Sequence, residues 1–259
     1  GVSREYEHMR LAALDQLLTR PGAIVVASAA AALQRTLPPE TLGRSTRMVR
    51  RGEELPQEEL IRHLVWSGYT RCDQVEGVCQ FAARGGILDL YPPGQPQPVR
   101  IEYWGDEIDT IAFFDPATQR RTTTVEQAEI TPAREALIGD TEAFVAMLEE
   151  RKKNLRGKYG ARAKEQIDKD IAHLRDIGSL PAADKYLPLL YDNPATIFDY
   201  TADSMLFLCE PVSIKENLKN ASYQHQEDLT DLLEQGVLFR GCDVFSIDFT
   251  DVVRRVEEQ

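Results

Sequence analysis

Residues 81–109 read FAARGGILDLYPPGQPQPVRIEYWGDEID, and their pattern is the most informative about the fold of the chain. Short runs rich in apolar residues alternate in it with turn-forming Gly, Pro and Asp, as in strands joined by tight turns. The predicted strands are Phe81–Tyr91, Val99–Trp104, Ile108–Phe114 and Thr122–Ile130. Because strands this close in sequence favour antiparallel pairing, we expect a compact β-rich unit from Tyr69 to about Ala133.

The sequence on both sides of this unit is typical of α/β structure. Ala23–Ser28 and Met205–Cys209 are short apolar runs, as found in strands that a parallel sheet buries on both faces. Further strands are expected at Leu189–Tyr191, Val237–Phe239 and Val244–Phe249, and helices near the N-terminus and at about residues 56–67, 141–175 and 212–234. The simplest architecture is an α/β fold in which a parallel-sheet domain, residues 1–54 and 137–259, is interrupted by an inserted, mainly antiparallel, β-rich α+β domain at residues 55–136.

Composition and charge limit the classes of function. The 259 residues carry a formal net charge of −12, so the chain as a whole is a poor ligand for nucleic acid, which needs concentrated Lys and Arg. The four cysteines include no C-x-x-C pair and the four histidines have no metal-ligand spacing, so we expect free thiols and no zinc. The sequence has no apolar stretch of membrane-spanning length and starts without a signal peptide. We therefore expect a cytoplasmic protein that does not bind membranes.

Three sequence blocks in the middle of the chain carry a resemblance to a known family. Residues 68–76 read GYTRCDQVE, residues 84–92 read RGGILDLYP and residues 100–108 read RIEYWGDEI. In this order they resemble the signature that UvrB shares with the transcription-repair coupling factors (Mfd). The tripeptide Asp73-Gln74-Val75, the run FFDPATQR at residues 113–120 and the run ITPARE at residues 130–135 resemble the coupling factors more than UvrB.

The resemblance implies a fold and a set of partners. In this family the region has the fold of the first domains of UvrB, a degenerate helicase-like parallel-sheet domain, and the inserted β-rich domain binds UvrA. The family's translocase and RNA-polymerase-binding domains lie downstream, so DNA and RNA polymerase are expected as partners only of regions absent from this sequence. The other domains of the parent chain are further expected partners. If they mask the UvrA site, the same face is also an intramolecular autoinhibitory surface.

The resemblance also raises the question of ATP hydrolysis. A P-loop needs the string G-x-x-x-x-G-K-[ST], whose amides and lysine hold phosphate, and this sequence contains none. At the end of the predicted strand 205–209, Cys209 stands where UvrB-type motors place a magnesium-binding Asp, and a thiol is a poor ligand for that ion. We therefore expect a non-catalytic module without cofactor or metal. The alternative is a UvrB-like, ATP-dependent DNA-remodelling fragment, which predicts nucleotide binding.

The strand at residues 99–104 carries the candidate binding residues. Alternation along a strand directs the aliphatic residues to one face and Arg100, Glu102 and Trp104 to the other. Arg and Trp are frequent in interface hot spots; the alternative is a structural ladder, in which Arg100 pairs with Glu102 or a neighbour and Trp104 covers the sheet edge. The resemblance implies that Arg84, Arg100 and Trp104 belong to the UvrA-binding face, with Glu102 orienting the arginines. Trp104 stands where the family usually has Phe.

Two other features have ordinary structural explanations that we favour. Gly85-Gly86 lies between strand residues, where paired glycines mark a bulge or a close backbone approach more often than a phosphate loop. The basic run from Arg151 to Lys164 is flanked and followed by acidic residues. This mixture is typical of a solvated helix with i,i+4 pairs rather than of a DNA-binding surface.

Overall fold

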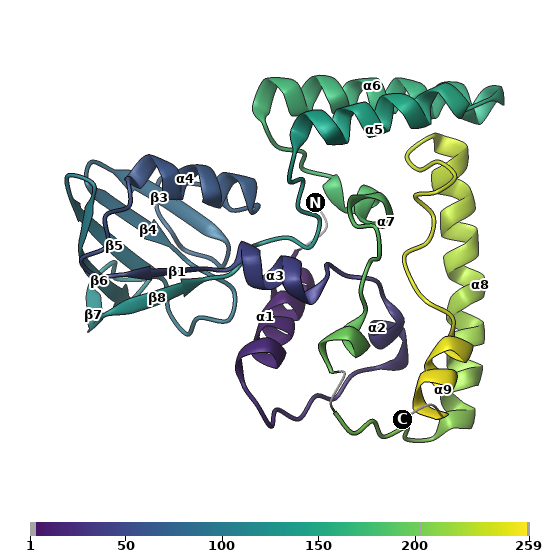
Figure 1. The fold of residues 1–259 in the computed structure, drawn as a ribbon, viewed down its shortest axis with the longest axis horizontal. Coiled ribbons are helices and arrows are strands. Elements are labelled where there is room, and N and C mark those ends of the chain that lie inside the picture. The colour runs from purple at the N-terminus through teal and green to yellow at the C-terminus, as the bar shows by residue number, and fades with distance from the viewer. Residues whose placement is uncertain (1–3, 202–203, 258–259) are drawn as a thin grey trace. The chain divides into compact units, whose positions relative to one another are not determined.

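The structure is a computed structural model that describes residues 4–201 and 204–257. It has mixed α/β architecture and divides into two compact units (Figure 1). Gly1–Pro21 and Glu40–Leu137 make up the first, here called the sheet unit; Gly22–Pro39 and Ile138–Gln259 make up the second, the helical unit. Each unit is therefore built from two separate segments of the chain.

The sheet unit contains a six-stranded sheet and a two-stranded ribbon. The strands of the larger sheet, in spatial order, are β2 (Thr70–Arg71), β3 (Gln80–Arg84), β4 (Ile87–Leu90), β5 (Val99–Trp104), β6 (Glu107–Phe114) and β7 (Arg121–Val125). β2 pairs parallel with β3, and the other neighbouring pairs are antiparallel. The ribbon pairs β1 (Arg47–Arg50) with β8 (Gln127–Ile130), also antiparallel. The predicted succession of antiparallel strands is confirmed, with two predicted strands each divided in two, at Gly85-Gly86 and at Glu126.

The main core lies on one face of the larger sheet, where α4 (Gln57–Trp66) packs (Figure 1). Leu60 and Leu64, four residues apart on this helix, are fully buried among inward-facing strand residues. Side chains at this spacing share one face of a helix, and the helix predicted at about residues 56–67 is confirmed. The other members of this core come from every long strand of the sheet and include Phe81, Leu88, Ile101 and Ile111. Removing their apolar area from water, at roughly 25 cal/mol per Å², is the main force that stabilises the unit.

The opposite face of the sheet is less apolar. A small cluster of Val75, Ala82 and Phe114 is buried there, with Cys72 and Tyr91 packed against it. The rest of this face bears charged and polar residues from the middle strands. The sheet is thus buried on one side and polar on the other, as is common for antiparallel sheets.

The N-terminal helix α1 (Glu5–Thr19) belongs to the sheet unit. Its residues Leu11 and Leu14 are buried, and Arg10 forms an ion pair of 3.3 Å with Glu135. The short helix α3 (Pro39–Ser45) leads into β1. β1 pairs with β8, and this segment of the sheet unit begins at Glu40.

The helical unit is dominated by long helices. Its elements are α2 (Ala29–Leu33), α5 (Thr141–Asn154), α6 (Gly157–Ile177), α7 (Leu187–Leu190), α8 (Pro211–Gln235) and α9 (Phe249–Glu257), with 3-10 turns at Ala183–Tyr186 and Ile197–Tyr200. Tyr186 is buried in this unit; its hydroxyl donates to Asp170 Oδ2 at 2.6 Å, and its ring meets that of Phe144 edge-on. α8 ends at Gly236, where a Cβ would lie 2.7 Å from the backbone of Arg162. The predicted helix at 212–234 is confirmed, and the predicted helical region at 141–175 is confirmed as two helices, α5 and α6.

The predicted parallel sheet is wrong for the part of the helical unit that the structure describes. Residues 23–28 form no strand before α2 begins, and Ile24 and Val26 are 93% and 94% exposed. Residues 205–209 are also irregular, with Met205 and Phe207 exposed. A continuous apolar run indicates a tendency to be buried, but a strand forms only where a neighbour supplies hydrogen-bond partners.

The remaining strands predicted for this unit are wrong as well. Residues 189–191 overlap the end of α7, and residues 237–239 lie in the turn that follows α8. Within residues 244–249 the observed pairing is an isolated bridge between Ser246 and Gln34. These runs were too short for their apolar residues to distinguish a strand from a turn packed into a helical core. Among the described residues, no helix has both the length and the hydropathy needed to cross a membrane.

Candidate partner-docking face

The strand register brings the predicted binding residues onto the polar face of the sheet. Asp89 on β4 lies directly opposite Arg100 on β5, and Ile87 lies opposite Glu102. On the other side of β4, Arg84 of β3 lies opposite Ile87. We define the docking face as Arg84, Asp89, Arg100, Glu102, Trp104 and Arg121.

A fully buried carboxylate organises this face. Asp89 accepts two hydrogen bonds from Arg100, from Nε to Oδ1 at 2.7 Å and from Nη2 to Oδ2 at 2.8 Å. Arg84 Nη2 donates a third, longer bond to Oδ2 at 3.4 Å. A parallel two-bond contact between a guanidinium and a carboxylate is strong and directional. One carboxylate therefore connects both predicted arginines.

The guanidinium group of Arg100 has further contacts besides Asp89. Its Nη1 donates to the backbone oxygen of Gln119 at 3.3 Å, and its Cζ lies 4.8 Å from the centre of the Phe114 ring. The hydrogen bonds to Asp89 raise the pKa of Arg100 above its usual value, against the opposing effect of burial. The side chain of Arg100 is only 15% exposed, whereas that of Arg84 is 57% exposed. Arg84 is thus the more accessible of the two arginines.

Gln119 connects this network to a loop. Its backbone has a positive φ of 60°, a conformation uncommon for residues other than glycine. Its side-chain amide donates to the carbonyl oxygens of Pro116 at 2.7 Å and Val75 at 3.1 Å. These bonds fix the turn before β7 against the segment that contains Val75, and the carbonyl of Gln119 is thereby presented to Arg100.

The two remaining predicted residues lie further along β5. Glu102 was predicted to orient Arg84 and Arg100, but it pairs with Arg121 of β7. The carboxylate that holds the two arginines is that of Asp89. Trp104, at the end of β5, is 83% exposed and does not cover the sheet edge. The arginine therefore pairs with a neighbouring acid, as the structural alternative expected, while the aromatic ring remains available on the surface.

Asp89, Gln119 and Arg121 were missed from sequence. A signal for Asp89 was available, because alternation along ILDL at residues 87–90 places this acid on the face opposite Leu88 and Leu90. Its pairing with Arg100 depends on register, which a single sequence does not show. The role of Gln119 depends on an irregular turn and could not have been found from periodicity.

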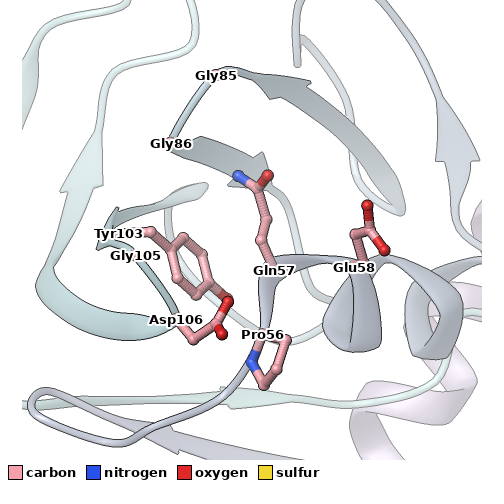
Figure 2. A pocket seen from close by; sticks show the side chains of 8 residues that line it. All are labelled: Pro56, Gln57, Glu58, Gly85, Gly86, Tyr103, Gly105 and Asp106. Atoms are coloured by element: carbon pink, nitrogen blue, oxygen red, sulfur yellow. The ribbon is translucent and has the colours of Figure 1, made fainter.

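The glycine pair lies at the tip of the β3–β4 hairpin, beside a shallow pocket of about 330 Å³ (Figure 2). The carbonyl oxygen of Gly86 accepts a hydrogen bond from the backbone N–H of Tyr103 at 2.8 Å. A Cβ on Gly86 would lie 3.1 Å from the backbone carbonyl oxygen of Tyr103. The predicted close backbone approach is confirmed. Glu58 and Asp106 also line the pocket. Their negative charges would repel a phosphate group, which argues against a phosphate loop.

The other predicted features fit ordinary structural explanations. All four cysteines are free, and the described residues contain no group of three metal-ligating side chains. In the basic run, Lys152 pairs with Asp168 at 2.6 Å and with Glu149 at 2.7 Å, and Lys153 pairs with Glu150 at 2.7 Å. The predicted pairing with nearby acids is found at these two lysines, but the pairs are i,i+3 contacts on α5 and, for Lys152 with Asp168, a contact between α5 and α6, not the predicted i,i+4 pairs of one helix.

Comparison with known proteins shows which protein families this chain is similar to. The family described as the UvrB interaction domain matches residues 48–135, which include β2 to β8, β1 except its first residue, and the whole docking face. The chain is 34% identical over 247 residues to the transcription-repair-coupling factor of Bacillus subtilis (strain 168), covering 91% of this chain and 21% of that protein. It is 30% identical over 251 residues to the UvrABC system protein B of Thermus thermophilus, covering 89% of this chain and 37% of that protein.

A second coupling factor, from Haemophilus influenzae, is 31% identical over 202 residues, which are 77% of this chain and 17% of that protein. The chain thus spans well under half the length of each of these relatives. The family match therefore lies within the sheet unit, where residues 48–135 are similar to the UvrB interaction domain. The whole chain is similar to part of the transcription-repair coupling factors and to part of UvrB, and the resemblance drawn from the three sequence blocks is confirmed.

Proposed function

We propose that this chain is a non-catalytic docking module that recruits UvrA in transcription-coupled nucleotide excision repair. The match to the UvrB interaction domain and the similarity to coupling factors and UvrB support a role in DNA repair. The partner follows from the family resemblance. The observation that carries the proposal is the docking face itself, where the predicted arginines converge on one buried carboxylate and the end of β5 bears an exposed tryptophan.

The chemistry of this face suits protein recognition. Arg84 presents a partly exposed guanidinium and Trp104 presents an exposed ring, the residue types most enriched in interface hot spots. Both project from strands whose other face packs into the main core. Rigid strands reduce the conformational entropy that binding would otherwise cost.

The wider organisation is part of the proposal. We infer that the matched domain interrupts a degenerate UvrB-like domain of a longer coupling factor, because the family match covers residues 48–135 while the relatives align over most of the chain. The longer protein would then supply the DNA translocase activity and the contact with RNA polymerase. Its setting would be the cytoplasm, and no catalytic step is assigned to the residues of this chain.

Calorimetric binding to UvrA tests this proposal. The intact chain should bind, and Arg84→Glu should weaken binding by about tenfold or more, since it reverses the charge of the exposed arginine on the docking face. Arg62→Glu is the matched control, because it makes the same charge change at an exposed position on α4. Repeating the titration at two salt concentrations should show stronger binding at low salt.

Two results would oppose the proposal. Failure of the intact chain to bind UvrA would show that UvrA is not its partner. Equal losses of UvrA affinity in Arg84→Glu and Arg62→Glu would show that the docking face is not the binding surface. ATP binding by the chain would instead favour the alternative of a UvrB-like remodelling fragment.

A further inference from the structure

We propose that Asp89 is a positioning residue for partner binding, and that the two arginines it holds have different roles. Arg100 would be an internal support, and Arg84 the cation that meets a carboxylate on the partner. This inference rests on the proposed function and specifies how the docking face works. It begins from Asp89, a residue that faces away from the main core and is nevertheless completely buried.

The first step is the cost of burying Asp89. A carboxylate removed from water is strongly destabilising unless cations and hydrogen-bond donors compensate for the lost hydration. Three N–H groups do so here, two from Arg100 and one from Arg84. A structural pair would need Arg100 alone, which already contacts both oxygens. The additional bond from the more exposed Arg84 is what links Asp89 to the surface.

The second step is the accessibility of each arginine. In the described part of the chain, Arg100 uses Nε and Nη2 on Asp89 and Nη1 on Gln119, and Phe114 packs against its guanidinium group. Its donors are therefore directed within the protein. Arg84 contacts Asp89 through Nη2, and more than half of its side chain is exposed. Arg84 can therefore use its remaining donors on a partner while Asp89 still holds one end of the guanidinium group.

The third step concerns the partner's chemistry. A guanidinium fixed at one nitrogen presents its other N–H groups in a known direction, and a planar carboxylate matches that geometry. Ile87, which lies opposite both Arg84 and Glu102 in the register, adds a half-buried apolar patch beside it. We therefore expect the contacting segment of UvrA to present an acidic side chain next to an apolar one.

The central experiment is a double-variant comparison of UvrA affinity. Asp89→Asn keeps the shape of the side chain but removes its charge, and it should weaken binding by about tenfold. In an Arg84→Ala background the same change should weaken binding by less than about twofold, because the group that Asp89 positions is absent. Asp109→Asn is the matched control, since it removes one negative charge from an exposed position of β6.

A spectroscopic measurement separates positioning from general loss of structure. The Nε–H group of Arg100 donates to Asp89, so its NMR signal in the free protein should be shielded from rapid exchange with water. Asp89→Asn should increase that exchange while the amide signals of the core strands keep their positions. If Asp89→Asn fails to fold, Arg100→Lys provides the test instead: it keeps the charge, loses the two-bond contact and should still weaken UvrA binding several-fold, whereas Arg62→Lys should not.

The possible outcomes distinguish this inference from the proposed function. If the unaltered chain binds UvrA and Arg84→Glu weakens it, the docking proposal holds. If Asp89→Asn then binds normally, or loses as much affinity in the Arg84→Ala background as alone, the positioning role of Asp89 is overturned. If the unaltered chain does not bind UvrA at all, the proposed function fails first.

Discussion

The two faces of the larger sheet are built from the same strands but serve different purposes. On one face, aliphatic and aromatic residues such as Phe81, Leu88 and Ile101 are fully buried beneath α4. On the other, Asp89 is just as buried but is held by two arginines. Packing on the apolar face requires only side chains of the right volume and shape. On the polar face the buried carboxylate also requires hydrogen-bond donors at specific positions. The polar face is therefore where a small change should alter binding more than folding.

The largest expected effect is on the apolar face. Phe81→Ala should lower the free energy of unfolding by about 3–5 kcal/mol, because it removes a large, fully buried ring and leaves a cavity. Both tryptophans, Trp66 and Trp104, lie in the sheet unit, so fluorescence during urea unfolding reports on it. Val65→Ala, a truncation at an exposed position of α4, should change the same quantity by less than about 0.5 kcal/mol. Similar losses for both variants would contradict the assignment of the core.

The next effect tests the buried pair on the polar face. Arg100→Met should cost about 2–4 kcal/mol of unfolding free energy, since Asp89 would keep only its longer bond to Arg84. Adding Asp89→Leu to this variant should recover part of the loss, because no buried charge then remains. The description of Asp89 as a charge dependent on Arg100 would be wrong if the single variant were as stable as the unaltered chain.

A contrasting carboxyl group should make stability depend on pH. Burial, and then the nearby Glu129, raise the pKa of Asp15 to about 7. Because this value lies above the ordinary 3.8, the stabilising contribution is fully present below about pH 4 and is lost as the pH rises through 7. Asp15→Asn should therefore be more stable than the unaltered chain by about 1–3 kcal/mol at pH 8, with a smaller difference at pH 5.

Urea unfolding at the two pH values measures this difference. Glu126→Gln, at an exposed position next to β8, is the control and should keep the pH dependence of the unaltered chain. An unchanged pH dependence in Asp15→Asn would show that this carboxyl group ionises normally. The comparison with Asp89 is direct, since one buried acid has arginine partners and the other lies beside a second acid.

The smallest expected effect on stability is at Trp104. Trp104→Ala should change the unfolding free energy by less than about 0.5 kcal/mol, because the ring is mostly exposed. It should nevertheless weaken UvrA binding by about tenfold, as expected for an aromatic anchor. Trp104→Phe should retain most of the affinity. An alanine variant that binds normally would leave Arg84 as the main contact on the docking face.

The pattern of success from sequence has a physical cause. In the sheet unit, alternation along residues 99–104 predicted the facing of Arg100, Glu102 and Trp104, since a strand with one buried face has only two ways to orient its side chains. In the helical unit, Ala23–Ser28 and Met205–Cys209 were predicted as buried strands and are neither buried nor strands. Hydrophobicity alone does not specify the neighbour with which a segment pairs.

Local sequence patterns were sufficient to predict the β-rich unit, the helix at α4, the close backbone approach at Gly86 and the family resemblance, because each depends on residues near one another in the chain. The folded structure was needed to show that Asp89, rather than Glu102, holds Arg84 and Arg100, and that Gln119 completes the network. Those contacts join residues of different strands and an irregular turn. Their formation depends on strand register and on the free-energy cost of burying a charge. The local periodicity of apolar residues predicts neither of these.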